Sequence, residues 1–230
     1  AMVFSMYGSA PALAEDIKAE AEKKTIYVSG QAKVYASPDI AYITLGVITE
    51  DKDAKTAQQR NAASMEKVIG AIKSSGVKAD DIKTVEYSIY PNYTYDKETG
   101  NRTLTGYTVN NSVMVTVRDV SKAGNIIDAA SKSGVNTSSS ISFALSDYEK
   151  YYNEALKNAV TAARKKANTI AQSLDVTLKG PVSVNEGGGY SPLRNYVTYA
   201  DSVAEAETIT PIMAGTLEIT ANVNIVYEYN

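Results

Sequence analysis

The chain alternates between stretches with a hydrophobic residue at every second position and stretches with helical spacing. Residues 217–229 are the most regular, with hydrophobic side chains at the odd positions and polar ones at the even positions, Val226 excepted. This period of two predicts a strand with one buried and one solvated face. We expect so long a strand either to curve around the helices or to project past the domain edge, where a second subunit can pair with it.

Similar patterns predict strands at 25–35, 40–50, 82–95, 103–118, 138–147 and 181–186. The strand at 40–50 is apolar on both faces, which is typical of a central strand. Residues 186–207 show no period and contain Gly and Pro, so a loop is expected there.

Three helices are predicted, at 54–75, 120–133 and 148–174. Asp53 can cap the first helix, and glycines at 76 and 134 can end the first two. Asn61 lies on the apolar stripe of the first helix and is interpreted as a residue at the core boundary. The predicted inner stripe of the third helix is Tyr152, Leu156, Ala159, Ala163, Ala167, Ile170 and Leu174.

Strands in pairs separated by helices predict an α+β fold, with largely antiparallel sheets and two or three helices packed on one face. The segments "KSSGV" and "SKSGV" end two helices in a similar way, so a duplicated ββαβ unit is one hypothesis. One domain is expected over 25–230. Its candidate sub-regions are 25–80 with 146–230, and 82–145.

The composition excludes several kinds of chemistry, because the chain contains no Cys, no His and no Trp. Nucleophilic mechanisms that use His and ordinary zinc sites therefore have no residues to build on. A net charge of −3 offers no basic surface for nucleic acid. No apolar run approaches the ~20 residues of a membrane span. We predict no catalytic residue, no cofactor and no metal ligand.

The first residues point to export. Ala12-Leu13-Ala14 has the A-x-A form of a secretory cleavage site, although a charged region before it is missing. An alanine-rich helix start is the alternative. Residues 1–24 are therefore interpreted as the end of a signal peptide and an N-terminal arm.

Three segments carry a resemblance to a known family: "TIYVSGQAKVYASPDIAYITLGV", "NAVTAARKKANTIAQSLDVTLKGPVSVNEGG" and "TPIMAGTLEITANVNIVYEY". Together they resemble the SIMPL-domain family of exported bacterial proteins, which includes periplasmic immunogenic antigens. The proline that usually precedes Gly215 is Ala214 here. The resemblance implies a periplasmic or cell-surface location, frequent oligomerisation, a link to oxidative-stress tolerance and no established reaction.

Tyrosine is unusually frequent, with 17 residues against two Phe. Tyr rings suit interfaces because they bury an apolar ring while the hydroxyl stays hydrated. A homo-oligomer with a further cell-envelope partner is the favoured hypothesis. A carboxylate-based hydrolase or a glycan-binding protein at the cell wall is the alternative, and a calcium site at Asp96, Glu98 and Asn101 is weighed too. The candidate contact residues surround one predicted hairpin: Tyr87, Tyr90, Tyr93, Tyr95 and Tyr107.

Overall fold

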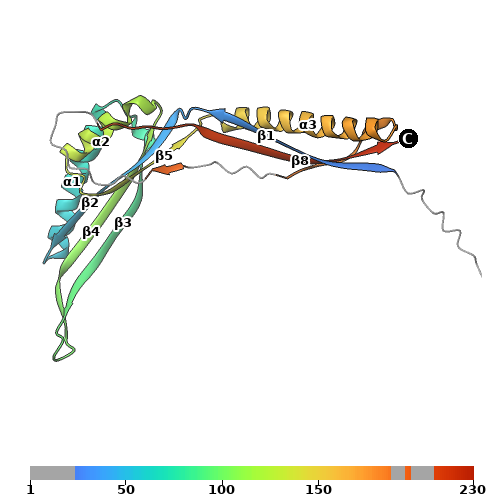
Figure 1. The fold of residues 1–230 in the computed structure, drawn as a ribbon. Coiled ribbons are helices and arrows are strands. Elements are labelled where there is room, and N and C mark those ends of the chain that lie inside the picture. Colours follow the sequence, from blue (N-terminus) through green and yellow to red (C-terminus); the bar gives the residue numbers. More distant parts are fainter. Residues whose placement is uncertain (1–23, 188–194, 198–209) are drawn as a thin grey trace, which may run out of the picture.

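The structure, a computed structural model, describes residues 24–187, 195–197 and 210–230 and contains two antiparallel sheets (Figure 1). The first sheet has the order β1 (Thr25–Ala36), β8 (Leu217–Tyr229), β6 (Leu178–Glu186). The second has the order β3 (Ile82–Tyr95), β4 (Arg102–Val117), β2 (Ile40–Asp51), β5 (Thr137–Ala144), β7 (Asn195–Val197). The predicted α+β class with antiparallel sheets is confirmed.

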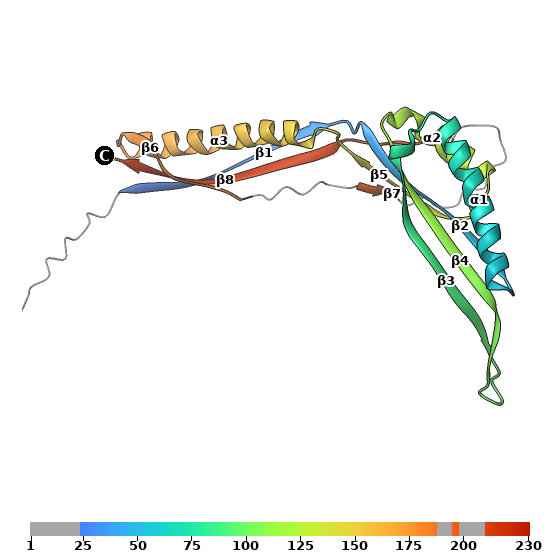
Figure 2. The same cartoon turned by 180° about the vertical axis from the view of Figure 1, so that it is seen from behind.

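Each sheet carries its helices on one face. Helix α3 (Tyr148–Ser173) lies along β1 and β8, whereas α1 (Ala54–Ser74) and α2 (Ala123–Lys132) cover the second sheet (Figures 1 and 2). Short 3₁₀ turns at Ala79–Asp81 and Val120–Lys122 precede β3 and α2. Two separate clusters of buried side chains result, one under α3 and one under α1 and α2.

Local signals in the sequence set the ends of these helices. The Asp53 side chain accepts a hydrogen bond from the Thr56 N–H at 2.8 Å, which caps α1 and lowers the pKa of that carboxyl group. Gly76 follows α1 with a φ of +92°, a conformation that glycine adopts without strain. Both predictions are confirmed.

Strand β8 is the central strand of the first sheet and pairs with β1 along its whole length, from Thr25 opposite Glu228 to Ala36 opposite Leu217. Its inner face packs under α3, as the period of two predicted. The buried side chains of this face are Leu217, Ile219, Ala221, Val223, Ile225 and Tyr227.

The inner stripe of α3 differs from the prediction. Ile170 and Leu174 are exposed, with 39% and 58% of their surface accessible. Gly30 explains the difference, because a Cβ built there would lie 2.0 Å from the Ala159 carbonyl oxygen. The helix axis approaches β1 so closely that only small side chains fit between them. The buried stripe is an alanine at every fourth position: Ala155, Ala159, Ala163, Ala167 and Ala171.

Two further expectations were wrong. Asn61 lies not at the core boundary but inside the core, at 0% exposure, because its amide donates to the carbonyl oxygens of Val47 (2.9 Å) and Val109 (3.2 Å). The segment expected to be loop contains β7, which pairs with β5. Residues 188–194 and 198–207 of that segment, and the expected signal remnant apart from Lys24, lie outside the described residues.

Candidate functional site

The tyrosine-rich hairpin of β3 and β4 extends beyond the helices of the second sheet (Figure 1). Strand β3 is the edge strand of that sheet, and α1 packs on β2 and β4 instead. The hairpin therefore presents large apolar side chains to solvent. These exposed residues, called the hairpin patch below, are Val85, Tyr87, Ile89, Tyr90, Tyr93, Tyr95 and Leu104.

The structure does not gather the five predicted tyrosines on one surface. Tyr87 points towards α1, because its hydroxyl lies 3.5 Å from the side-chain nitrogen of Gln58. Tyr90 is three residues further along a regular stretch of β3, so its ring lies on the opposite face. Tyr107 is half-buried and pairs with Pro91, on the same face as Tyr87. Tyr93 and Tyr95 lie near the tip.

At the tip, side-chain contacts stiffen the hairpin. The guanidinium of Arg102 lies over the Tyr93 ring, 3.5 Å from its centroid. Asp96 accepts hydrogen bonds from the N–H groups of Glu98 (2.8 Å) and Thr99 (3.1 Å), which lowers the pKa of its carboxyl group. These bonds give Asp96 a structural role in the turn. Within the described residues, no three metal-ligating side chains of the types Asp, Glu, His and Cys come together.

Several carboxyl groups elsewhere accept hydrogen bonds from cations or from N–H and O–H donors. Asp81 accepts two hydrogen bonds from Arg118, at 2.7 and 3.1 Å, and this lowers the pKa of Asp81. Glu218 accepts from Lys33 (2.8 Å) and the Tyr35 hydroxyl (2.9 Å), and its pKa is lowered as well. A general acid needs the opposite shift at neutral pH, so these two carboxyl groups are poorly suited to that role.

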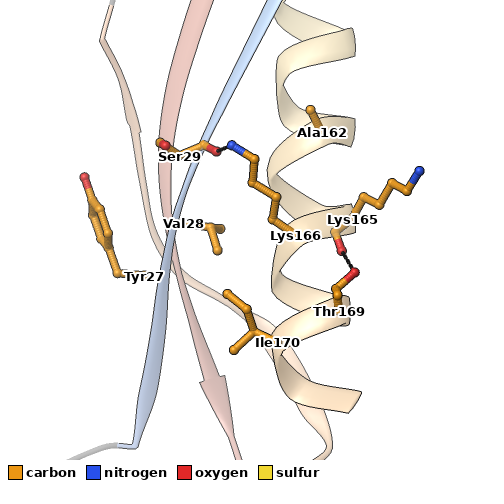
Figure 3. A pocket seen from close by; sticks show the side chains of 8 residues that line it. All are labelled: Tyr27, Val28, Ser29, Ala162, Lys165, Lys166, Thr169 and Ile170. Carbon is orange, nitrogen blue, oxygen red and sulfur yellow. Dashed lines mark hydrogen bonds between the residues drawn. The ribbon is translucent and has the colours of Figure 1, made fainter. Parts of the chain in front are cut away.

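Sequence reasoning missed a groove of about 610 Å³ between β1 and α3 (Figure 3). Ile170 lines it from the helix and Val28 from the strand, and their side chains point towards one another. Lys166 crosses the groove and donates to the Ser29 carbonyl oxygen at 2.8 Å. The sequence contains a signal for this groove, because the small alanines of α3 form the contact with β1 and leave Ile170 outside it. This signal can be recognised only once Gly30 is known to lie against these alanines. The full lining is Tyr27, Val28, Ser29, Ala162, Lys165, Lys166, Thr169 and Ile170.

Comparison with known proteins finds related sequences. The sequence profile of SIMPL, described as a protein of unknown function, matches residues 26–227. The 26 kDa periplasmic immunogenic protein of Brucella melitensis is 31% identical over 226 residues, which cover 96% of this chain and 90% of that protein. The uncharacterized protein YggE of Escherichia coli K12 is 31% identical over 157 residues, 68% of this chain and 63% of YggE.

Proposed function

The chain belongs to the SIMPL family, and from this premise we propose that it is an exported, non-enzymatic envelope protein that assembles into a homo-oligomer. Its relatives named as periplasmic support the predicted export. None of the helices in the described part has both the length and the hydrophobicity of a membrane-spanning helix.

The hairpin patch is the observation that carries the proposal. Its side chains lie on a projecting two-stranded ribbon whose outer strand is an edge strand. Exposed apolar side chains on a projecting element are typical of protein–protein contact surfaces, and Tyr is enriched at the centre of such surfaces. Because the rings lie on both faces of the ribbon, one hairpin can contact two neighbours.

The alternative functions find less support. A glycan platform needs aromatic rings on a common surface, but Tyr87 and Tyr90 lie on opposite faces of the ribbon. A carboxylate-based hydrolase needs two carboxyl groups facing each other across a cleft. The carboxyl groups of Asp81 and Glu218 are held by cations instead. The link to oxidative-stress tolerance that the resemblance implies stays a prediction.

Light scattering on the purified protein tests the proposal. We expect a particle several times the chain mass of 24.6 kDa, unchanged by dilution at micromolar concentration. Tyr90→Lys and Tyr95→Lys place charges in the patch and should give a smaller particle, with little cost to folding because both rings are exposed. Met213→Lys is the control, because Met213 is exposed but lies off the hairpin. A wild-type monomer would contradict the proposal.

A further inference from the structure

The β1–α3 groove lies at the outer edge of the first sheet. Tyr229 N–H donates to the Lys24 carbonyl oxygen, so the even-numbered residues of β1 form the hydrogen-bonded pairs with β8. The odd-numbered residues, among them Tyr27 and Ser29, therefore direct their N–H and C=O groups away from the sheet. Lys166 meets one of these groups, the Ser29 carbonyl, so the side chains of α3 overhang the edge of β1.

The opposite edge of the same sheet has less of this cover, because α3 reaches only the end of β6, where the Tyr152 hydroxyl donates to the Glu186 carboxylate. Helix α3 packs on β1 and β8 and barely contacts β6. Val184 pairs with Ile225 and Glu186 with Val223, so both β6 side chains lie on the face that α3 occupies. Both are exposed, Val184 at 59%.

The β6 backbone at this edge is oriented for pairing as well. Gly187 N–H donates to the Asn222 carbonyl oxygen, so Gly187 belongs to the hydrogen-bonded pairs with β8. The backbone groups of Val184 and Glu186 then face outwards, by the alternation of an antiparallel ladder.

The two edges complement each other. The groove offers an apolar floor at Val28 and Ile170, with Lys165 and Lys166 at its side. Strand β6 presents the apolar side chain of Val184 and, two residues later, the carboxylate of Glu186. Val28 and Val184 both pair with Ile225 of β8, so the three residues form one row across the sheet. Gly30 and Glu186 form the next such row, because both pair with Val223. Continuing the sheet in the same register would bring Val184 of a second copy beside Ile170. It would also bring the Glu186 carboxylate, which accepts from Tyr152 of its own chain, near Lys166.

We propose that the β1–α3 groove receives strand β6 of a second copy of this chain, so that first sheets join head to tail with the incoming strand parallel to β1. The inference rests on the proposed function, since the occupant is another copy, but it uses elements other than the hairpin. The overhanging part of α3 would cover the exposed side chains of β6. Lys166 would release the Ser29 carbonyl, which then accepts from the Glu186 N–H of the incoming strand. Because this contact joins two different surfaces, repeating it leads to a closed ring or an open filament.

Other occupants fit less well. An acyl chain would leave the outward N–H and C=O groups of β1, apart from the Ser29 carbonyl that Lys166 contacts, against hydrocarbon without hydrogen bonds. A two-fold pairing of β1 with β1 would bring Lys165 and Lys166 of both copies together, and like charges facing each other oppose association.

Engineered cysteines test the pairing directly, because the chain contains none of its own. Ser29 and Asn185 both pair with Asn224, so their side chains share the face away from α3. In the proposed register, Ser29 of one copy lies beside Asn185 of the next. After mild oxidation, the double variant Ser29→Cys/Asn185→Cys should give a ladder of covalent multimers on a non-reducing gel. Each single variant should give none.

A matched pair of charge variants tests the same contact without cross-linking. Val184→Lys places a cation near Lys165 and Lys166 of the next copy, whereas Val184→Glu places a carboxylate there. Val184 is exposed within its own chain, so both variants should fold equally well. We expect Val184→Lys to lower the particle mass more than Val184→Glu does.

The outcomes separate the two proposals. A wild-type monomer would overturn both. If the wild type assembles but the cysteine variant gives no ladder and the two Val184 variants have equal particle masses, only the proposed pairing of β6 with the groove is overturned. Covalent dimers from Ser29→Cys alone would show the two-fold pairing instead.

Discussion

The contact between Tyr152 and Glu186 ties α3 to the end of β6 through one hydrogen bond. The Tyr152 hydroxyl donates to the Glu186 carboxylate, and this bond, together with partial burial, raises the pKa of Tyr152 to about 12. The ordinary value is about 10. The folded chain therefore holds this proton more tightly than the unfolded chain does.

This shift predicts a loss of stability in alkali. The contribution of Tyr152 is complete below pH ~10 and is lost as the pH rises towards about 12. Tyr152→Phe should lower the free energy of unfolding at pH 7 by about 0.5–1.5 kcal/mol. Urea unfolding at several pH values should show a steeper decline for wild type than for the variant between pH 10 and 12. Parallel declines would mean that the bond does not stabilise the fold.

Asn61 shows where reading single residues fails. Its position on the apolar stripe of α1 was read correctly, but a polar residue there was placed at the boundary. The carbonyl groups of Val47 and Val109 on neighbouring strands accept from its amide, and these strands are 14 and 48 residues away. A buried amide is stable only with such acceptors. A single sequence does not disclose which distant backbone groups supply them.

At the scale of elements, the packing of α3 on β1 depends on small residues at the contact. Successive residues of an α-helix are rotated by about 100° around its axis, so residues four positions apart are offset by about 40°. The line that joins the buried alanines is the contact line of α3. The line therefore winds around α3 and matches a twisted sheet better than a straight stripe would. Ile170 does not lie on this line of alanines, so its side chain lines the groove instead.

Gly30→Ala tests this close contact. The added methyl group meets the Ala159 carbonyl and the Ala163 side chain, so the helix must move away from the strand. We expect the free energy of unfolding to fall by about 1–3 kcal/mol, which chemical denaturation measures. Gly180→Ala in β6 is the control. A Cβ there meets nothing within 4 Å, so stability should stay unchanged or rise slightly. Equal effects in both variants would contradict the close contact.

The elements themselves were largely predictable, whereas their assignment to sheets was not. Period-two patterns and turn residues located β3 and β8, because those signals are local. The partner of β1 is β8, and their pairing joins residues about 200 positions apart. Consecutive strands β1 and β2 lie in different sheets, which no local pattern reveals. The tyrosine hairpin was predicted for the same local reason, and the groove was missed because it depends on which strand forms a sheet edge.

At the scale of the whole molecule, the two sheet-and-helix units have separate cores, and the chain passes between the units several times (Figure 2). The described stretches between elements of different units include residues 37–39, 145–147 and 210–216. Asp39 links the first two, because its carboxylate accepts from the Ser146 N–H at 2.7 Å and from the Ser146 hydroxyl. The third approaches the second unit, where the Thr210 N–H donates to Asp128 at 3.1 Å and Ile212 packs on the core.

Asp39 should therefore help the two units to unfold together. Calorimetry of wild type should show one transition, with a calorimetric enthalpy equal to the van't Hoff enthalpy. Asp39→Ala removes both hydrogen bonds to Ser146, and we expect a broader transition with a calorimetric enthalpy above the van't Hoff value. Asp39→Asn keeps an oxygen that can accept from the Ser146 N–H and should lie between the two. If Asp39→Ala lowers the Tm but the two enthalpies stay equal, the remaining segments couple the units without Asp39.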